Sequence, residues 1–316
     1  YYTKIRNFQK ADSLLNKALI LINPQSKQHV DIYTNLLLQK AVNDVYLKSN
    51  NKLEGDLHQI ENLLYDKTFN SIFFQTESGR ESFISAVDKQ IGILNSIYLN
   101  LPSNTAGSIY NNVLSMKNLV LYSHLHLKQF IKKIGKEKYY YAITQERKQL
   151  EEKILNVSRE SEYDSILDFQ KRLEIAEKTF LGELVTRPDF SFLNPRAKTW
   201  HEVQSSLAPN QAAIEIFNCR IHPYSQDSIR YYALIITKET SAPKLIPLFY
   251  ENELLKLLEG RGSTIDNVNN FYVKNREKVY NILWKPIDEA ISERTTDLVL
   301  SVSGILHSVS FTPFVG

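Results

Sequence analysis

The interpretation of the fold depends on one stretch near the end of the chain, Asp297-Leu-Val-Leu-Ser-Val-Ser-Gly-Ile-Leu-His-Ser-Val-Ser-Phe-Thr-Pro-Phe314. Its apolar, β-branched run from Leu298 to Val302 predicts a strand that is buried on both faces. Ser303-Gly304 then predicts a turn, because glycine adopts a positive φ at little cost. Taken alone, this pattern indicates a core strand followed by a turn.

Three further strands are expected upstream of this stretch. Residues 200–217 predict a short helix, a turn and a strand, and residues 230–237 and 244–249 predict two more strands. We expect these strands to be antiparallel, because the connections between them are too short for crossover helices. Pro247 indicates an edge position, since proline cannot donate a hydrogen bond to a neighbouring strand.

Two helices are expected between these strands and the final one. Residues 251–258 predict a short helix, and residues 271–290 predict a longer one. Pro286 lies inside the longer pattern and should kink the helix or end its first half. The residues expected on its inward face are Val279, Leu283, Trp284 and Ile287.

The beginning of the chain predicts helical pairs. Residues 2–22 place apolar and small side chains at helical spacing, at Phe8, Ala11, Leu15, Ala18 and Leu19. Asn23-Pro24 should end this helix. A second pair is expected at residues 30–47 and 53–64, with a less regular period.

The middle of the chain predicts longer helices without a recognisable repeat. They are expected at residues 83–97, from a cap at Ser108 to Tyr122, at 138–155 and at 163–184. The last two interleave Glu and Lys, which is typical of helices with a solvated face. Residues 187–195 are aromatic, contain proline and lack periodicity, so they predict a linker.

The order of several motifs resembles the CHAT domain, a caspase-like peptidase domain associated with tetratricopeptide repeats (TPRs). The motifs are Trp200-x-x-Val, Leu207-x-Pro-x-x-Ala-Ala-Ile-Glu, Tyr231-Tyr-Ala-Leu-Ile and Tyr280-x-x-Leu-Trp-x-Pro-Ile. The turn after residue 302 ends this series of motifs. In the resemblance, the residues of the family's turn correspond here to Ser303, Gly304, Leu306, His307 and Phe311. This resemblance covers about residues 199–315, and a looser one links Phe8, Ala11, Ala18 and Asn23-Pro24 to the second helix of a TPR.

The resemblance implies a mainly α-helical, TPR-like region and long helices, followed by an incomplete α/β CHAT domain. The expected boundaries are 1–65 for the TPR-like repeats, 66–190 for the helical connector and 191–316 for the N-terminal part of the CHAT domain. It also implies a cysteine endopeptidase that cleaves protein substrates, with the repeats binding a regulatory partner. The family's catalytic His and Cys are expected beyond Gly316, so the chain is expected to be an interior segment without catalytic residues.

Composition and net charge argue against several other classes of protein. The 316 residues are 43% hydrophobic and 23% charged, which is typical of a globular protein. The net charge of +3 is too small to indicate direct contact with nucleic acid or an anionic membrane, although a nucleoprotein partner complex is compatible with it. One cysteine excludes a disulfide framework and a thiolate zinc site, which favours the cytoplasm. No cofactor is expected.

Cys219 and His222 form the most obvious candidate for catalysis, because a thiolate–imidazolium pair is nucleophilic. However, they lie three residues apart at the exit of a strand, where no helix N-terminus or oxyanion hole is expected. Cys219 is therefore interpreted as an apolar packing residue. We expect no catalytic, cofactor-binding or metal-binding residue in this chain.

The remaining candidates have structural interpretations. His307 is expected to brace the turn by hydrogen bonding, and His124 and His126 should point to different sides of one helix. Gly260-Arg-Gly-Ser263 lacks the ending of a phosphate-binding loop. Two groups complete the set. The first is the basic and aromatic residues of Lys128–Tyr141, a composition that also occurs on single-strand binding surfaces, and the second is the adjacent carboxylates Glu151 and Glu152.

Two function classes remain open from the sequence. The first is the regulatory and N-terminal portion of a TPR–CHAT peptidase, and the second is a helical-repeat binding scaffold without catalysis. The expected partners are a protein or peptide on the TPR-like surface, the protein substrate of the peptidase, and the remaining CHAT polypeptide as a separate chain.

Overall fold

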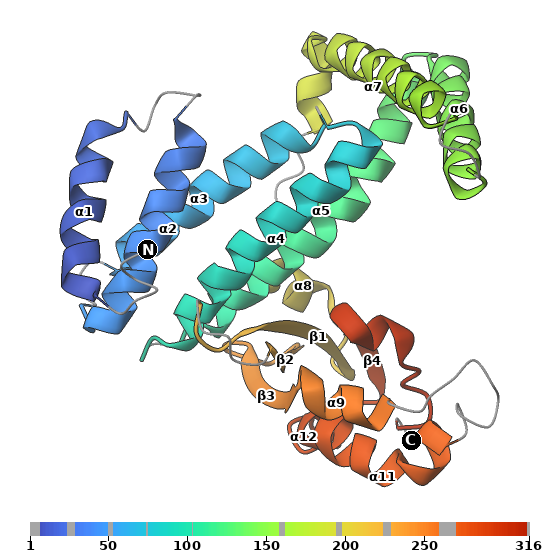
Figure 1. The fold of residues 1–316 in the computed structure, drawn as a ribbon. Coiled ribbons are helices and arrows are strands. Elements are labelled where there is room, and N and C mark those ends of the chain that lie inside the picture. The colour runs from blue at the N-terminus through green and yellow to red at the C-terminus, as the bar shows by residue number, and fades with distance from the viewer. Residues whose placement is uncertain are drawn as a thin grey trace. The chain divides into compact units, whose positions relative to one another are not determined.

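The computed structural model describes residues 7–23, 29–49, 53–73, 75–102, 104–157, 162–193, 198–223, 229–258 and 270–314. These residues are mostly helical, with one small mixed sheet (Figure 1). The chain divides into two compact units. The first comprises Tyr1–Ile60, Lys89–Ser115 and Ala197–Gly316, and the second comprises Glu61–Asp88 and Met116–Arg196.

Seven long helices precede the sheet in the described sequence. They are α1 (Phe8–Leu21), α2 (Val30–Leu47), α3 (Leu53–Ile72), α4 (Glu77–Leu99), α5 (Ala106–Lys133), α6 (Glu137–Leu155) and α7 (Tyr163–Val185). The predicted helices therefore exist, and the range 30–47 is confirmed to the residue. None of the described helices carries an apolar stretch sufficient to cross a lipid bilayer.

One helix start and one linker differ from the sequence-based prediction. Ser108 lies inside α5, which begins at Ala106, and the side chain of Asn104 accepts a hydrogen bond from the Ala106 amide. The predicted linker contains the 3-10 helix η2 (Pro188–Leu193). Phe190 of η2 is buried edge-on against Phe73 and Phe130, because a large aromatic side chain gains more by joining the core than by staying in water.

The α1–α2 hairpin belongs to the first unit, and contacts of small, aromatic and polar residues hold its two helices together. Ala11 is the fully buried residue of α1, so its size permits the close approach of α2. The ring of Phe8 stacks on Tyr46 at a centroid distance of 4.7 Å, and Asn43 donates a hydrogen bond to the Phe8 carbonyl. Lys40 forms ion pairs with Asp44 and Asp12, which connects the two helices.

The second unit has its own apolar core, built from α3–α7 and η2. Helices α6 and α7 lie side by side (Figure 1). Between them, the guanidinium of Arg147 forms an ion pair with the buried carboxylate of Glu177. Such a pair stabilises the hairpin only while both partners are present, since either charge alone would be costly to bury.

The sheet has the order β3-β2-β1-β4 and lies in the first unit. Its strands are β1 (Gln211–Arg220), β2 (Ile229–Thr237), β3 (Lys244–Tyr250) and β4 (Asp297–Ser301). β1 and β3 are antiparallel to β2, as predicted, and β4 is parallel to β1. Pro247 lies in the edge strand β3, which confirms its predicted position.

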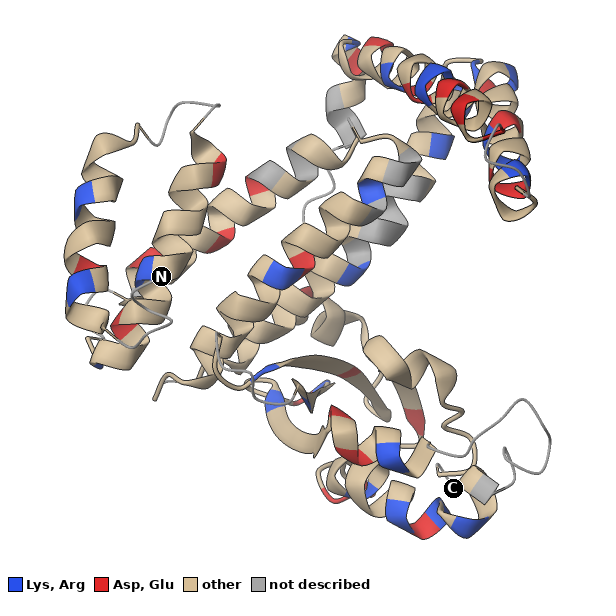
Figure 2. Cartoon of the chain, viewed as in Figure 1, with Lys and Arg blue, Asp and Glu red and all other residues tan. Residues whose placement is uncertain are grey.

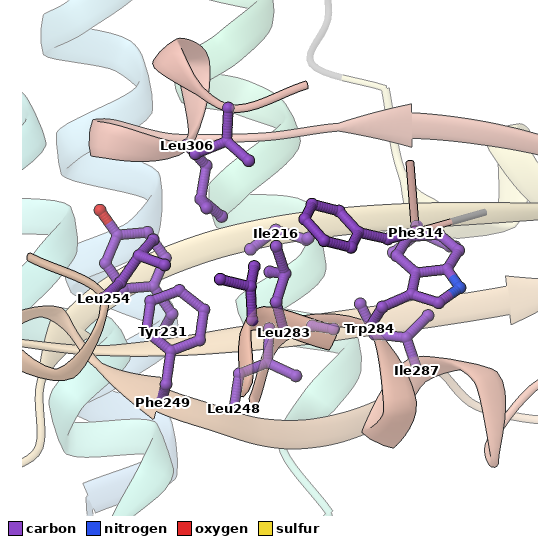
Figure 3. Packing of buried hydrophobic residues seen from close by; sticks show 14 of the residues in the cluster. Ile216, Tyr231, Leu248, Phe249, Leu254, Leu283, Trp284, Ile287, Leu306 and Phe314 are labelled. Carbon is purple, nitrogen blue, oxygen red and sulfur yellow. The ribbon is translucent and has the colours of Figure 1, made fainter. Parts of the chain in front are cut away.

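One face of the sheet is covered by the C-terminal helices. They are α9 (Glu251–Leu258), the π-helical turns η3 (Asn270–Lys274) and η4 (Tyr280–Trp284), α11 (Arg276–Val279) and α12 (Lys285–Asp288). The predicted helix 271–290 is thus interrupted: Pro286 stands at the start of α12, where its missing N–H is harmless. Val279, Leu283, Trp284 and Ile287 are all buried as predicted, and Figure 3 shows the last three in the core.

The other face of β1 carries Ala213, Glu215, Phe217 and Cys219, because successive side chains alternate. The helix α8 (Trp200–Ser206) precedes β1 and starts with a capping box formed by Thr199 and Glu202. The backbone amide of Trp200 donates a hydrogen bond to Asn111 of α5 at 2.8 Å. A Cβ on Gly107 would lie 2.8 Å from the Trp200 indole nitrogen, so glycine permits this contact.

The expectation that residues 298–302 are buried on both faces is wrong. Leu298 and Leu300 pack against the core below the sheet, but the side chain of Val299 is 56% exposed. β4 pairs with β1 alone within the described ranges, so it is an edge strand. Composition alone cannot distinguish a central strand from an edge strand that has one uncovered face.

We predict that Ala11→Tyr lowers the free energy of unfolding by roughly 1–3 kcal/mol, because the larger side chain overpacks the α1–α2 contact. Ser13→Tyr is the matched control, since Ser13 is exposed on the same helix. Urea denaturation followed by circular dichroism measures both variants. Equal midpoints for the two would contradict the close packing at Ala11.

Candidate functional site

The turn after β4 is the most strongly constrained feature near the end of the described chain. Gly304 has a φ of +62°, which confirms the glycine turn predicted from the sequence. The 3-10 helix η5 (Gly304–Ser308) follows directly and buries Leu306. The turn is therefore fixed both by its backbone conformation and by an apolar anchor.

The hydroxyl of Tyr231 holds this turn against the sheet. It accepts a hydrogen bond from the Ile305 amide at 3.1 Å and donates one to the Glu251 carboxylate at 3.3 Å. The Asn218 side chain reaches the same hydroxyl at 3.5 Å. The three partners come from the turn, from α9 and from β1, so one phenol connects three elements of the unit.

Space around this hydroxyl explains why residue 304 is glycine. A Cβ built on Gly304 would collide with the Tyr231 hydroxyl oxygen. The Tyr231 ring stacks on Phe249 at a centroid distance of 4.8 Å and cannot easily move aside (Figure 3). Positive φ and close approach therefore both require glycine at this position.

The protonation state of Tyr231 follows from its surroundings. Burial, together with the nearby Glu251 carboxylate, raises the pKa of Tyr231 to about 12, although the hydrogen bond from Ile305 acts in the opposite direction. The phenol therefore keeps its proton at neutral pH and can donate it to Glu251. The protonated phenol thus positions a backbone turn and is not itself a nucleophile at neutral pH.

His307 does not brace this turn, in contrast to the sequence-based expectation. Its side chain is exposed on η5, and the hydrogen bond that Ile305 donates goes to Tyr231 instead. The phenol reaches the turn from β2, which is separated from β4 by β1 in the sheet. The sequence separation of 74 residues between Tyr231 and Ile305 left no local signal for this contact.

Cys219 lies buried on the sheet face opposite the C-terminal helices. Burial raises the pKa of the Cys219 thiol to about 12, although a hydrogen bond with Ser96 acts in the opposite direction. His222 is exposed, whereas the cysteine is not. A thiol that stays protonated at neutral pH is a poor nucleophile, so the geometry agrees with the interpretation of Cys219 as a packing residue.

Polar side chains of α4 hold the end of β1, and the sequence did not reveal them. The Ser96 hydroxyl donates a hydrogen bond to the Arg220 carbonyl, and the Asn100 side chain donates one to the Ile221 carbonyl at 2.7 Å. Both acceptors are backbone groups more than a hundred residues away in sequence. Small polar residues inside an otherwise apolar helix were the one available signal.

The other sequence candidates do not converge on a site. His124 and His126 both lie in α5, but the side chain of His124 and the segment Gly260–Ser263 fall outside the described residues. Glu151 and Glu152 are exposed on α6, as predicted. Within the described ranges, no group of three or more His, Cys, Asp or Glu side chains is arranged to hold a metal ion.

The basic and aromatic segment 128–141 spans the end of α5 and the start of α6. Tyr139 and Tyr140 both pack against Phe180 of α7. Two of the three adjacent tyrosines in this segment therefore help to hold α6 against α7. Figure 2 shows positive and negative residues interspersed along α6 and α7. This distribution favours a solvated helix face over a surface that tracks a phosphate backbone.

Comparisons with protein-family models, with curated proteins and with solved structures found no match for this chain.

We predict that Gly304→Ala lowers the free energy of unfolding by at least about 1–2 kcal/mol, the cost of positive φ for a residue with a Cβ. The collision with Tyr231 adds to this cost. Tyr231→Phe removes the colliding oxygen, so the double variant should lose less stability than the two single variants together. A double-mutant cycle by urea denaturation measures the coupling, and strict additivity would contradict the contact.

Cys219 should be protected from alkylation in the native protein. We predict that iodoacetamide at mildly alkaline pH modifies Cys219 rapidly only when urea is added, and prompt labelling of the native chain would contradict its burial. Stability should also fall as the pH rises from about 9 to 12, because the unfolded thiol loses its proton near 9.0 and the folded thiol near 12. Cys219→Ala should make this decline shallower.

Proposed function

We propose that residues 191–316 form the N-terminal part of a CHAT domain within a TPR–CHAT cysteine endopeptidase that cleaves protein substrates. One observation carries the proposal: β4 pairs parallel with β1 and leads directly into the Gly304 turn. The motif order implies a strand followed by the Ser303-Gly304 turn, and Leu306 is buried directly after that turn.

The chain's own role in this proposal is to build and position one side of the sheet. The turn held by Tyr231 sets the direction in which the polypeptide leaves β4. The CHAT resemblance places the catalytic His and Cys in later strands, so the chemistry belongs to polypeptide outside this segment. The buried, protonated thiol of Cys219 supports that division of roles.

The helical region is proposed to bind a regulatory protein or peptide in the cytoplasm. Support comes from the α1–α2 hairpin, whose close packing at Ala11 matches the small residue expected in a TPR-like pair. The same helix leaves Ile20 and Leu21 more than 80% exposed. Large apolar side chains in water favour a surface that another polypeptide covers.

A binding scaffold without catalysis is the second candidate. The observation that favours it is the absence of an activated thiol in the described part of the chain, where Cys219 is buried with a raised pKa. In this case the sheet would serve as a structural support for the helices. The two candidates differ in whether the complete gene product contains a second, reactive cysteine.

The deciding experiment uses the complete polypeptide encoded by the gene and a thiol-directed activity probe. If the peptidase proposal is correct, the probe labels a cysteine other than Cys219, and Cys219→Ala retains both labelling and peptide turnover. The 316-residue chain alone should show no turnover. Labelling or turnover that disappears in Cys219→Ala would contradict the proposal, and a complete product without a reactive cysteine would favour the scaffold.

A further inference from the structure

The two edges of the sheet differ in how they are protected from further pairing. The β3 edge begins with the exposed Lys244, carries the exposed Pro247 at its centre and has an irregular register opposite Arg230–Tyr232. Charges, prolines and bulges are the features by which natural sheets block edge-to-edge association. The β3 edge is therefore closed to a further strand.

The β4 edge has fewer of these features. Its one charged residue is the exposed Asp297 at the start of the strand, no Lys, Arg, Asp, Glu or Pro occurs from residue 298 to residue 312, and β4 pairs with β1 in regular register. In the described part of the chain, β1 is the one strand that pairs with β4. A regular edge without proline, and with a charge only at its first residue, offers a row of backbone groups to an incoming strand.

The face of β4 away from the C-terminal helices is also uncovered. Val299 is the partner of Ala213 in the parallel register, so both side chains lie on the same face of the sheet. Ala213 is buried, whereas Val299 is 56% exposed. Leu298 and Leu300 point to the opposite face and pack against the core. The free edge thus coincides with an exposed β-branched side chain.

We propose that β4 pairs with β4 of a second copy of this chain, antiparallel and centred on Val299. This register places Val299 opposite Val299, Leu298 opposite Leu300, and Asp297 opposite Ser301. No like charges face each other in this register. Opposed side chains lie on the same face of the sheet, so the apolar residues of one copy face apolar residues of the other. The pairing joins two four-stranded sheets into one continuous sheet.

The charge pattern favours a second copy over another protein. The one charged residue of β4, Asp297, faces the uncharged Ser301 in this register, so the strand fits its own sequence without repulsion. A ladder of five residue pairs is small compared with the roughly 1,200–2,000 Å² buried in stable complexes. Association should therefore be reversible and depend on concentration. The inference is independent of the peptidase proposal. A strand from a catalytic polypeptide would compete with the second copy for the same edge of the sheet.

Sedimentation equilibrium of the 316-residue chain over a wide concentration range tests the pairing. The wild type should show a monomer–dimer equilibrium. Val299→Lys and Val299→Glu should each weaken dimerisation by roughly tenfold or more, because each places like charges directly opposite one another. An equimolar mixture of the two variants should dimerise again, since Lys then faces Glu. Val273→Lys is the control, because Val273 is 72% exposed on η3, away from the sheet edge.

Hydrogen exchange provides the second measurement. The outward amides of β4 should exchange in dilute wild-type protein and become protected in the dimer, while the amides of β2 keep their protection. A wild type that stays monomeric at the highest concentration would overturn the proposal. So would a dimer that Val299→Lys leaves intact, a Lys/Glu mixture that stays monomeric, or recovery of a different polypeptide's strand on β4.

Discussion

The parallel pairing of β1 with β4 is the interaction on which the rest of the α/β region depends. It joins residues 211–215 to residues 297–301, with two strands and several helices between them in the sequence. Asn210 sets the register: its carbonyl accepts hydrogen bonds from the Thr296 and Asp297 amides, and its side chain reaches both residues at 2.6 Å. Without this pairing, the C-terminal helices would have no continuous sheet to cover.

The pairing also determines where the turn after β4 can lie. Because β4 runs parallel to β1, its C-terminal end emerges beside Asn218 and the hydroxyl of Tyr231. That hydroxyl fixes Ile305 and excludes any Cβ at residue 304. A single buried phenol thus fixes the direction in which the chain leaves this short edge strand. This is the property that a scaffold for chemistry elsewhere in a fold would need.

The helical and α/β parts of the first unit are joined mainly through backbone groups. Ser96 and Asn100 hold the carbonyls at the end of β1, and Asn111 accepts the amide that starts α8. Buried polar contacts of this kind are specific, because an unsatisfied partner costs more than the hydrogen bond itself contributes. α4 thus holds the C-terminal end of β1, and α5 holds the start of the helix α8 that precedes β1.

The sequence determined the elements whose signals are local. The 3.6-residue period predicted most helices, short connections predicted antiparallel strands, and Pro247 and Gly304 predicted an edge and a turn. The inward residues of the 271–290 segment followed from the same periodicity. These features depend on backbone conformation and on side-chain spacing within a few turns of chain.

Only the tertiary structure decided which side chains meet. The hydrogen bond from Ile305 to Tyr231 and the contacts of Ser96 and Asn100 with the end of β1 join residues 74 to 124 positions apart. It likewise decided that β4 lies at an edge with Val299 exposed, since an apolar strand has the same composition whether one or two neighbours flank it. Burial of Phe190 also followed from packing, because the free energy of burying a side chain depends on what surrounds it and not on its neighbours in sequence.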